Sequence, residues 1–180
     1  MDFESLTQEQ QELLGATLQA HYACTFRDNP STLAFQLAFE GSSSFSQAVS
    51  AALCSFGGGH APLLQTYELL ASESPNFQAM AMLDRGEKVP GWGTSFKNDD
   101  SWNRVQSIIS RDFPQWSEVL SSVTKVLNDN GKPIQPNPSA YTVVTALVIG
   151  LPKEMVSWII IQGRLGAWLT LGNQVIKGGT

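Results

Sequence analysis

The longest run of helical periodicity lies between residues 101 and 128, and it constrains the fold more than any other stretch. Pro114 interrupts the run, and a proline inside a helix removes a hydrogen bond and ends or kinks the helix. The pattern therefore predicts two helices, or one kinked helix, and no strand. The apolar residues that recur at intervals of three and four, as on one helical face, are Trp102, Val105, Ile108, Ile109, Trp116, Val119, Leu120, Val123 and Leu127.

Most of the remaining chain also has helical character. Thr7 and Gln10 form a capping-box pattern, which marks the start of a first helix. In one segment apolar residues alternate as in a strand, but Ala34 and Ala38 favour a helix. No strand–helix alternation is visible, so we expect a single all-α domain over residues 1–180, with about eight helices. The other expected helices cover residues 8–21, 31–39, 45–53, 62–71, 75–83, 141–149 and 153–174.

Charge and hydropathy argue against two classes of partner. The formal net charge is −5 and no Lys/Arg cluster occurs, which disfavours nucleic acids and anionic membranes. Residues 155–176 are apolar enough to span a bilayer, but they contain Gln162, Arg164 and Asn173. An arginine in mid-membrane costs about 2.5 kcal/mol or more. We therefore expect a buried helix in a cytoplasmic protein, and the acidic N-terminus is unlike a secretory signal.

The two cysteines indicate a reducing compartment and no metal site. Cys24 and Cys54 lie in apolar surroundings without CxxC spacing, which is typical of reduced core thiols. Their spacing to His21 and His60 matches no zinc-ligand pattern.

Residues 89–100 form a turn between helical segments, where binding groups are often found. Pro90, Gly91 and Gly93 exclude helix or strand, and the glycines allow a positive φ or a close approach of backbone to a ligand. Trp92 between them is either a ligand-stacking ring or a plug in the core. The Gly57–Gly59 run lacks the lysine and Ser/Thr of a P-loop, which disfavours a nucleotide site.

Three segments, in this order, resemble citrate synthases. Ala23-Cys24-Thr25-Phe26, followed by the glycine run that ends at His60, resembles the family's Ala-Ser-Thr-Phe and Gly-x-x-His motifs. Residues 90–94 resemble Pro-Gly-aromatic-Gly-His. Residues 136–141, 146–152 and 163–168 resemble Pro-Asn-Val-Asp-Phe-Tyr, Ala-Leu-Gly-Ile-Pro and Gly-Arg-Leu-x-Gly-Trp. The resemblance spans about residues 20–170, implies the C-terminal half of the family's fold, and makes residues 84–135 the counterpart of its small domain.

The resemblance also implies a catalytic site that has lost two of its three members. The family uses a carboxylate base, one histidine that donates a hydrogen bond to the enolate, and a second that polarises the substrate carbonyl. The enolate histidine corresponds to His60, the second histidine to Thr94 and the base to Ser139. Threonine cannot carry a charge at neutral pH, and an alcohol alone is no base for a carbon acid.

Several residues are candidates for ligand binding by the same resemblance. Arg164 matches a family arginine that binds substrate carboxylate. His21 lies two residues nearer the Ala-Cys-Thr-Phe segment than the family's substrate histidine does. The turn contributes Gly91, Trp92, Gly93 and Lys97.

Structural roles compete with these assignments. His60 could cap or pack a helix start, and Arg164 could pair with a buried acid or a carbonyl. Ser139 is most simply a helix cap.

Three functional hypotheses follow. In the first, the protein no longer makes citrate and has a binding, regulatory or structural role, as a homodimer packed through small residues in 41–52 and 163–167. In the second, it is an enzyme with altered acyl-CoA chemistry, a C–C lyase, condensation or thioester hydrolysis, in which His60 holds a coenzyme A thioester and Asp99 or Asp100 is the base. In the third, another protein subunit supplies what is missing. A viral source would fit the short chain.

Overall fold

The computed structural model describes residues 5–25, 30–41, 44–55, 61–93 and 100–178. Within these residues the chain forms nine α-helices and no strand, which confirms the all-α prediction. A single antiparallel bridge pairs Trp92 with Pro136. The elements are α1 (Gln8–Thr25), α2 (Pro30–Glu40), α3 (Phe45–Cys54), α4 (Ala61–Leu70), α5 (Pro75–Asp84), η2 (Asp100–Trp102), α6 (Asn103–Asp112), α7 (Pro114–Asp129), α8 (Pro138–Val148), η3 (Lys153–Met155) and α9 (Val156–Gly178).

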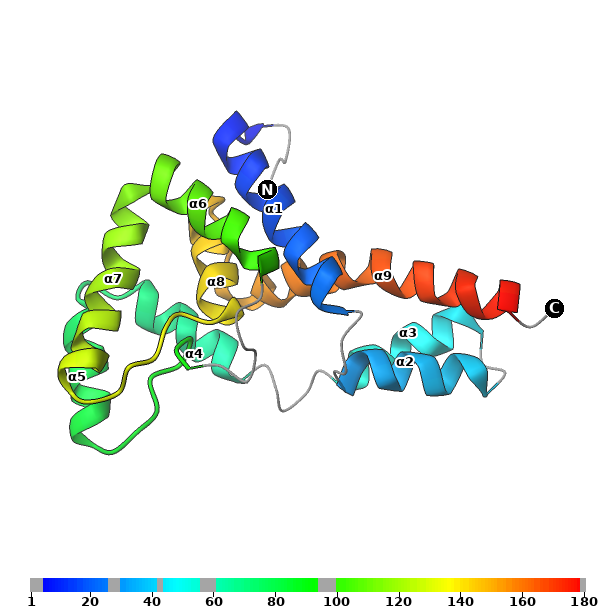
Figure 1. Ribbon diagram of the computed structural model, residues 1–180, viewed down its shortest axis with the longest axis horizontal. Coiled ribbons are helices and arrows are strands. Elements are labelled where there is room, and N and C mark those ends of the chain that lie inside the picture. Colours follow the sequence, from blue (N-terminus) through cyan, green and yellow to red (C-terminus); the bar gives the residue numbers. More distant parts are fainter. Residues whose placement is uncertain (1–4, 26–29, 42–43, 56–60, 94–99, 179–180) are drawn as a thin grey trace.

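Helix α8 is the centre of the larger part of the molecule, which we call the body. Every residue from Ala140 to Ala146 is buried, as expected for a helix that neighbours cover on all sides. Helices α1, α4 and α9 contact α8, and α5, α6 and α7 complete the body (Figure 1). Its core includes Leu13, Val105, Ile108, Val123 and Leu127.

Helices α2 and α3 pack on the C-terminal half of α9 and form a second, smaller unit, which we call the arm (Figure 1). Its buried apolar cluster is Phe35, Ala48, Ala52 and Trp168. Phe35 stacks on Trp168 with ring centroids 6.0 Å apart, and on Phe39 at 5.6 Å. The arm is therefore held by a few aromatic contacts.

Gly163 allows α1 and α9 to cross closely. A Cβ atom at this position would lie 2.5 Å from the Cβ of His21 and 2.8 Å from the carbonyl oxygen of Leu18. A Cβ at Gly166 would lie 3.5 Å from the ring of Tyr22, an ordinary contact. Gly163 and Gly166 therefore leave room for the approach of another helix, and that helix is α1 of the same chain.

Two helix ends differ from the predictions, at the end of α1 and the start of α8, and the predicted break at Pro114 is confirmed as two separate helices. Helix α1 continues to Thr25, so Ala23 and Cys24 lie in its last turn and not in a loop. Pro114 begins α7, because a proline fits the first helical turn, where its missing N–H is not needed. Asn137, not Ser139, caps α8, since its side chain accepts a hydrogen bond from the Ser139 N–H at 2.9 Å.

The capping box predicted at Thr7 and Gln10 is confirmed by two reciprocal hydrogen bonds. The Thr7 N–H donates to Gln10 Oε1 at 2.9 Å, and the Gln10 N–H donates to Thr7 Oγ1 at 3.3 Å. None of the helices in the described residues is long and apolar enough to cross a membrane.

Candidate functional site

The body and the arm meet where the end of α1, the start of α2, η2, α8 and the middle of α9 come together. We call this region the junction. It collects polar side chains that are far apart in sequence: His21, Cys24, Ser31, Trp102, Thr142 and Arg164. Two of them, His21 and Arg164, are candidates from the sequence.

His21 is buried in the junction, at 4 % exposure. Its Nε2 lies 2.9 Å from Thr142 Oγ1, and that hydroxyl donates its only hydrogen to the carbonyl oxygen of Pro138 at 2.7 Å. His21 Nε2 is therefore the donor, since the threonine oxygen can only accept from it. The imidazole meets the Trp102 ring edge-on, with centroids 5.0 Å apart.

Arg164 carries the positive charge of the junction. Its Nη1 donates to Ser31 Oγ at 2.8 Å, which ties α9 to the first turn of α2. Burial lowers the pKa of Arg164 from its ordinary value, because it disfavours the charged form, while the nearby Cys24 acts in the opposite direction. A guanidinium in such a place is suited to an anionic partner, above all a carboxylate.

Cys24 lies beside these groups. Its Sγ accepts a hydrogen bond from Trp102 Nε1 at 3.4 Å and lies 3.8 Å from Ser101 Oγ. Both cysteines are free thiols; Cys24 is buried, as expected, but Cys54 is exposed and the prediction of a core position for it is wrong. The reason is that Cys54 ends α3, where the helix leaves the arm's small core.

The Gly91–Gly93 turn is built into the body. Both glycines have φ of +84°, and a Cβ at Gly91 would lie 2.6 Å from the side chain of Thr66. Asn137 fastens the turn at two points, because its N–H donates to the Gly91 carbonyl and its side-chain amide donates to the Gly93 carbonyl, each at 2.9 Å. Trp92 is buried and its Nε1 donates to Thr124 Oγ1 at 2.9 Å. Of the two roles left open, Trp92 has the packing of a core plug.

Ser139 stands in the first turn of α8, half-buried. Asp100, one of the acids considered as a replacement base, is exposed and accepts a hydrogen bond from the Asn103 side chain at 3.1 Å. His60, Thr94, Lys97, Asp99 and the glycine run at 57–59 lie outside the described residues. Among the residues that are described, no group of three or more His, Cys, Asp or Glu side chains could hold a metal.

Sequence reasoning missed the partners that organise the junction. Ser31 and Thr142 belong to no recognisable sequence motif, so the sequence did not predict them as site residues. His21 and Cys24 are three residues apart on one helix, which places them on the same face. That spacing is the one signal in the sequence that could have linked them.

Comparisons with known proteins agree with this architecture. No protein-family model matches the sequence, and no curated protein matches it. Three similar solved structures are a citryl-CoA lyase from Hydrogenobacter thermophilus, a citrate synthase from Thermotoga maritima and an ATP citrate lyase from Methanothrix soehngenii.

The match covers nearly all of this chain but only part of each relative. With the lyase from Hydrogenobacter the TM-score is 0.78 at 17% identity, over 94% of this chain and 70% of the other. With the citrate synthase it is 0.72 at 18% identity, over 96% and 50%. With the ATP citrate lyase it is 0.72 at 13% identity, over 96% and 32%. The chain therefore has the all-helical fold that citrate synthase shares with citryl-CoA lyase and ATP citrate lyase.

Proposed function

We propose that this protein binds a carboxylate-bearing ligand, either a small dicarboxylic acid or its coenzyme A thioester, at the junction and does not make citrate. The observation that carries the proposal is Arg164, a largely buried guanidinium that donates to Ser31 beside His21 and Thr142. An arginine desolvated in this way gains from an anion, because burial opposes its charge.

The loss of citrate synthesis follows from residue chemistry. By resemblance the base falls on Ser139 and the carbonyl-polarising histidine on Thr94, and neither side chain can take over that role. General-base and electrostatic groups contribute roughly 10²–10⁴ each to a rate. Losing two of them leaves a binding site with little catalysis.

A thermal-unfolding series tests the binding proposal. Citrate, oxaloacetate, coenzyme A and acetyl-CoA are added at millimolar concentration to the wild type, to Arg164→Gln and to Arg85→Gln, an exposed control. A ligand at one hundred times its Kd adds roughly 2.7 kcal/mol and raises Tm by several degrees. We expect a shift for a carboxylate ligand in the wild type and in Arg85→Gln, and none in Arg164→Gln. An equal shift in all three proteins, or no shift with any ligand, would rule out Arg164 as the ligand-binding residue and the proposal with it.

A second candidate function is residual acyl-CoA chemistry, a C–C lyase, condensation or thioester hydrolysis. It is favoured by the likeness to a citryl-CoA lyase structure and by the retention of His60. Release of free coenzyme A from acetyl-CoA or citryl-CoA, measured with a thiol reagent, is the assay. Turnover that disappears in His60→Ala would support an enzyme, whereas turnover that survives this change would show that His60 is not the thioester-holding group.

We also propose that the arm pairs with a second copy of the chain. On α2, Phe35 and Phe39 face α3 and α9, whereas Leu33 and Leu37 are exposed, Leu37 at 72 %. Residues two apart in a helix point in nearly opposite directions, so the strand-like alternation in this segment is the pattern of a helix covered on both faces. Light scattering should give twice the monomer mass at micromolar concentration.

A matched pair of substitutions isolates that surface. Leu37→Glu should give a monomer, because it places a charge in the proposed contact. Phe77→Glu, on α5 of the body and 73 % exposed, should remain dimeric. A monomeric wild type, or a dimer that Leu37→Glu leaves intact, would rule out this face and turn the search to another subunit.

A further inference from the structure

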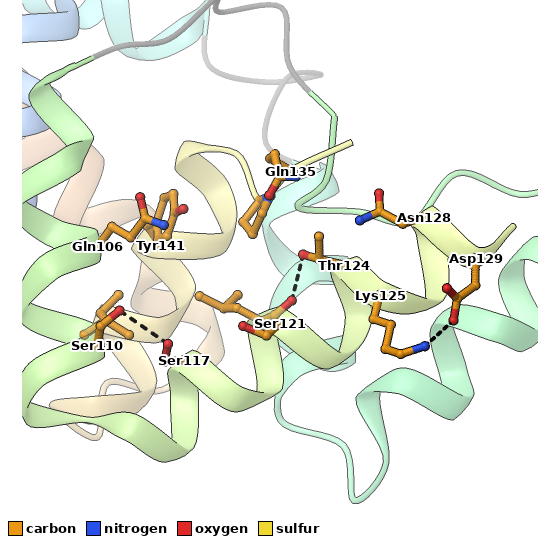
Figure 2. Close-up of a pocket in the computed structure, with 13 residues that line it drawn as sticks. Gln106, Ser110, Ser117, Ser121, Thr124, Lys125, Asn128, Asp129, Gln135 and Tyr141 are labelled. Carbon is orange, nitrogen blue, oxygen red and sulfur yellow. Dashed lines mark hydrogen bonds and ion pairs between the residues drawn. The ribbon is translucent and has the colours of Figure 1, made fainter. Parts of the chain in front are cut away.

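A groove outside the junction runs between α6 and α7. Its volume is about 310 Å³, at the lower end of the range of small-molecule sites. Figure 2 shows the polar side chains of the two helices, with Tyr141 beside Gln106 and Gln135 near Thr124. It is not explained by the carboxylate site, since neither His21 nor Arg164 lines it.

The groove combines an apolar floor with a neutral polar rim. Ile109, Leu120 and Tyr141 are buried and form the floor. The rim includes Gln106, Ser121 and the Ser110–Ser117 hydroxyl pair. Those hydroxyls are 3.3 Å apart, longer than a good O–H···O bond of about 2.7–2.8 Å, so a ligand hydroxyl could replace the contact with little loss.

The charges of the groove cancel. Lys125 and Asp129 are its charged lining residues, and they form a 2.6 Å ion pair with each other at one end (Figure 2). An anion would have to compete with Asp129 for the ammonium, and no arginine lines the groove. Carboxylates and phosphates are therefore poor occupants.

The remaining chemistry selects a neutral ligand with many hydroxyl groups. Within the described residues, the side-chain amides of Gln106, Asn128 and Gln135 make no hydrogen bond, and each offers both donors and an acceptor. A sugar or cyclic polyol has C–H faces that suit the floor and hydroxyls that suit amide and serine groups. We propose that this groove binds a neutral polyhydroxylated ligand of about monosaccharide size.

One wall of the groove is already fixed in place. Thr124 Oγ1 donates to the Leu120 carbonyl at 2.8 Å and accepts from Trp92 Nε1 at 2.9 Å. Tyr141 stacks on Trp102, with ring centroids 6.0 Å apart. Because both residues are held by neighbours, the floor and this wall need little ordering on binding, which lowers the entropic cost of association.

NMR titration of the full chain tests the proposal. D-glucose and myo-inositol are the probes, with inorganic phosphate and adenosine as counter-probes. A neutral ligand with about a dozen heavy atoms should bind with a Kd in about the millimolar range. We expect saturable shifts of the amides around Gln106 and Ser121 with a sugar or polyol, and none with phosphate.

Two serine substitutions on exposed helical positions supply the matched comparison. Ser121→Phe fills the groove and should weaken binding at least about tenfold, whereas Ser107→Phe on α6 lies outside the lining and should not. If Ser121→Phe does not fold, Gln106→Leu replaces it, because it removes an amide from the rim and should also weaken polyol binding. The proposal would be overturned if neither polyol gave a saturable shift, or if Ser121→Phe and Gln106→Leu bound the polyols as tightly as the wild type does. Binding of phosphate or adenosine in place of the polyols would also overturn it. Arg164→Gln should leave the polyol titration unchanged, which keeps this test separate from that of the junction.

Discussion

The body and the arm are built from the same kinds of residue but differ in how completely they bury them. In the body, α8 is enclosed from Ala140 to Ala146, and the core draws on six other α-helices. In the arm, α2 and α3 form with α9 an apolar cluster of four buried residues, while Leu33 and Leu37 lie exposed. The stability of a unit grows with the apolar surface that it removes from water. The body therefore buries more apolar surface than the arm does, and α2 and α3 depend on α9 to cover theirs.

The two parts also differ in charge. Arg111 of α6 bonds to Asp112 and reaches Glu12 of α1, at 2.6 and 2.8 Å. Helices α2 and α3 contain a single acidic residue, Glu40, and no basic one. The arm is thus held by packing and by the Arg164–Ser31 hydrogen bond, while surface ion pairs add to the body.

The largest effect should come from Trp168→Ala, which removes the centre of the arm. Truncating a buried tryptophan costs about 3–5 kcal/mol. If the arm is a separate, weaker unit, hydrogen exchange should show lost protection in α2 and α3 while α8 keeps most of its own. Equal loss of protection in α8 would mean that body and arm unfold as one unit.

Gly163→Ala should have the next largest effect, about 1–3 kcal/mol, because the added methyl collides with His21 and the Leu18 backbone where α1 crosses α9. Gly166→Ala is the control. It meets only an ordinary contact with Tyr22, so its better helix propensity should leave stability equal or raised by up to about 1 kcal/mol. Urea denaturation of the two variants measures the difference, and a Gly163→Ala protein as stable as Gly166→Ala would show that the crossing can relax.

The smallest effect is the response to acid, and it should be confined to the body. The hydrogen bond from Arg111 holds the pKa of Asp112 below its ordinary value of 3.8. A hydrogen bond from its own backbone N–H, and after it one from the Thr7 side chain, lowers the pKa of Glu9. A carboxylate with a depressed pKa stabilises the folded state fully above the ordinary pKa, and this stabilisation is lost as the pH falls through the folded-state value. Below about pH 4, we expect Tm to fall less steeply in Asp112→Asn than in the wild type. The substitution should leave the protection of the α2 and α3 amides against exchange unchanged. Identical pH profiles for the two proteins would show that this pair contributes nothing.

Much of the helix pattern could be predicted because it is local. The Thr7–Gln10 capping box, the break at Pro114 and the turn at Gly91 and Gly93 depend on residues within a few positions of one another. The structure has each of these features. The predicted end of α1 at residue 21 lies four residues before its actual end at Thr25. No glycine or proline occurs between these two positions, so nothing there stops the helix.

The candidate site was predictable only in part. His21 and Arg164 were identified by resemblance, but their partners Thr142 and Ser31 lie 121 and 133 residues away along the chain. The role of Trp92 was also not predictable from nearby residues. Its ring could have faced a ligand, and it is the contact with Thr124 on α7, distant in sequence, that shows it packed in the body.

The sequence by itself determined that this protein is all helical and where most of its helices break. By resemblance it also predicts alcohols at two positions where citrate synthases have catalytic groups. The tertiary structure decided which helical faces are covered, and which distant polar groups meet at the junction and in the groove. The physical reason is that hydrogen bonds within a helix and turn geometry depend on near neighbours, whereas burial and side-chain pairing depend on which elements pack together.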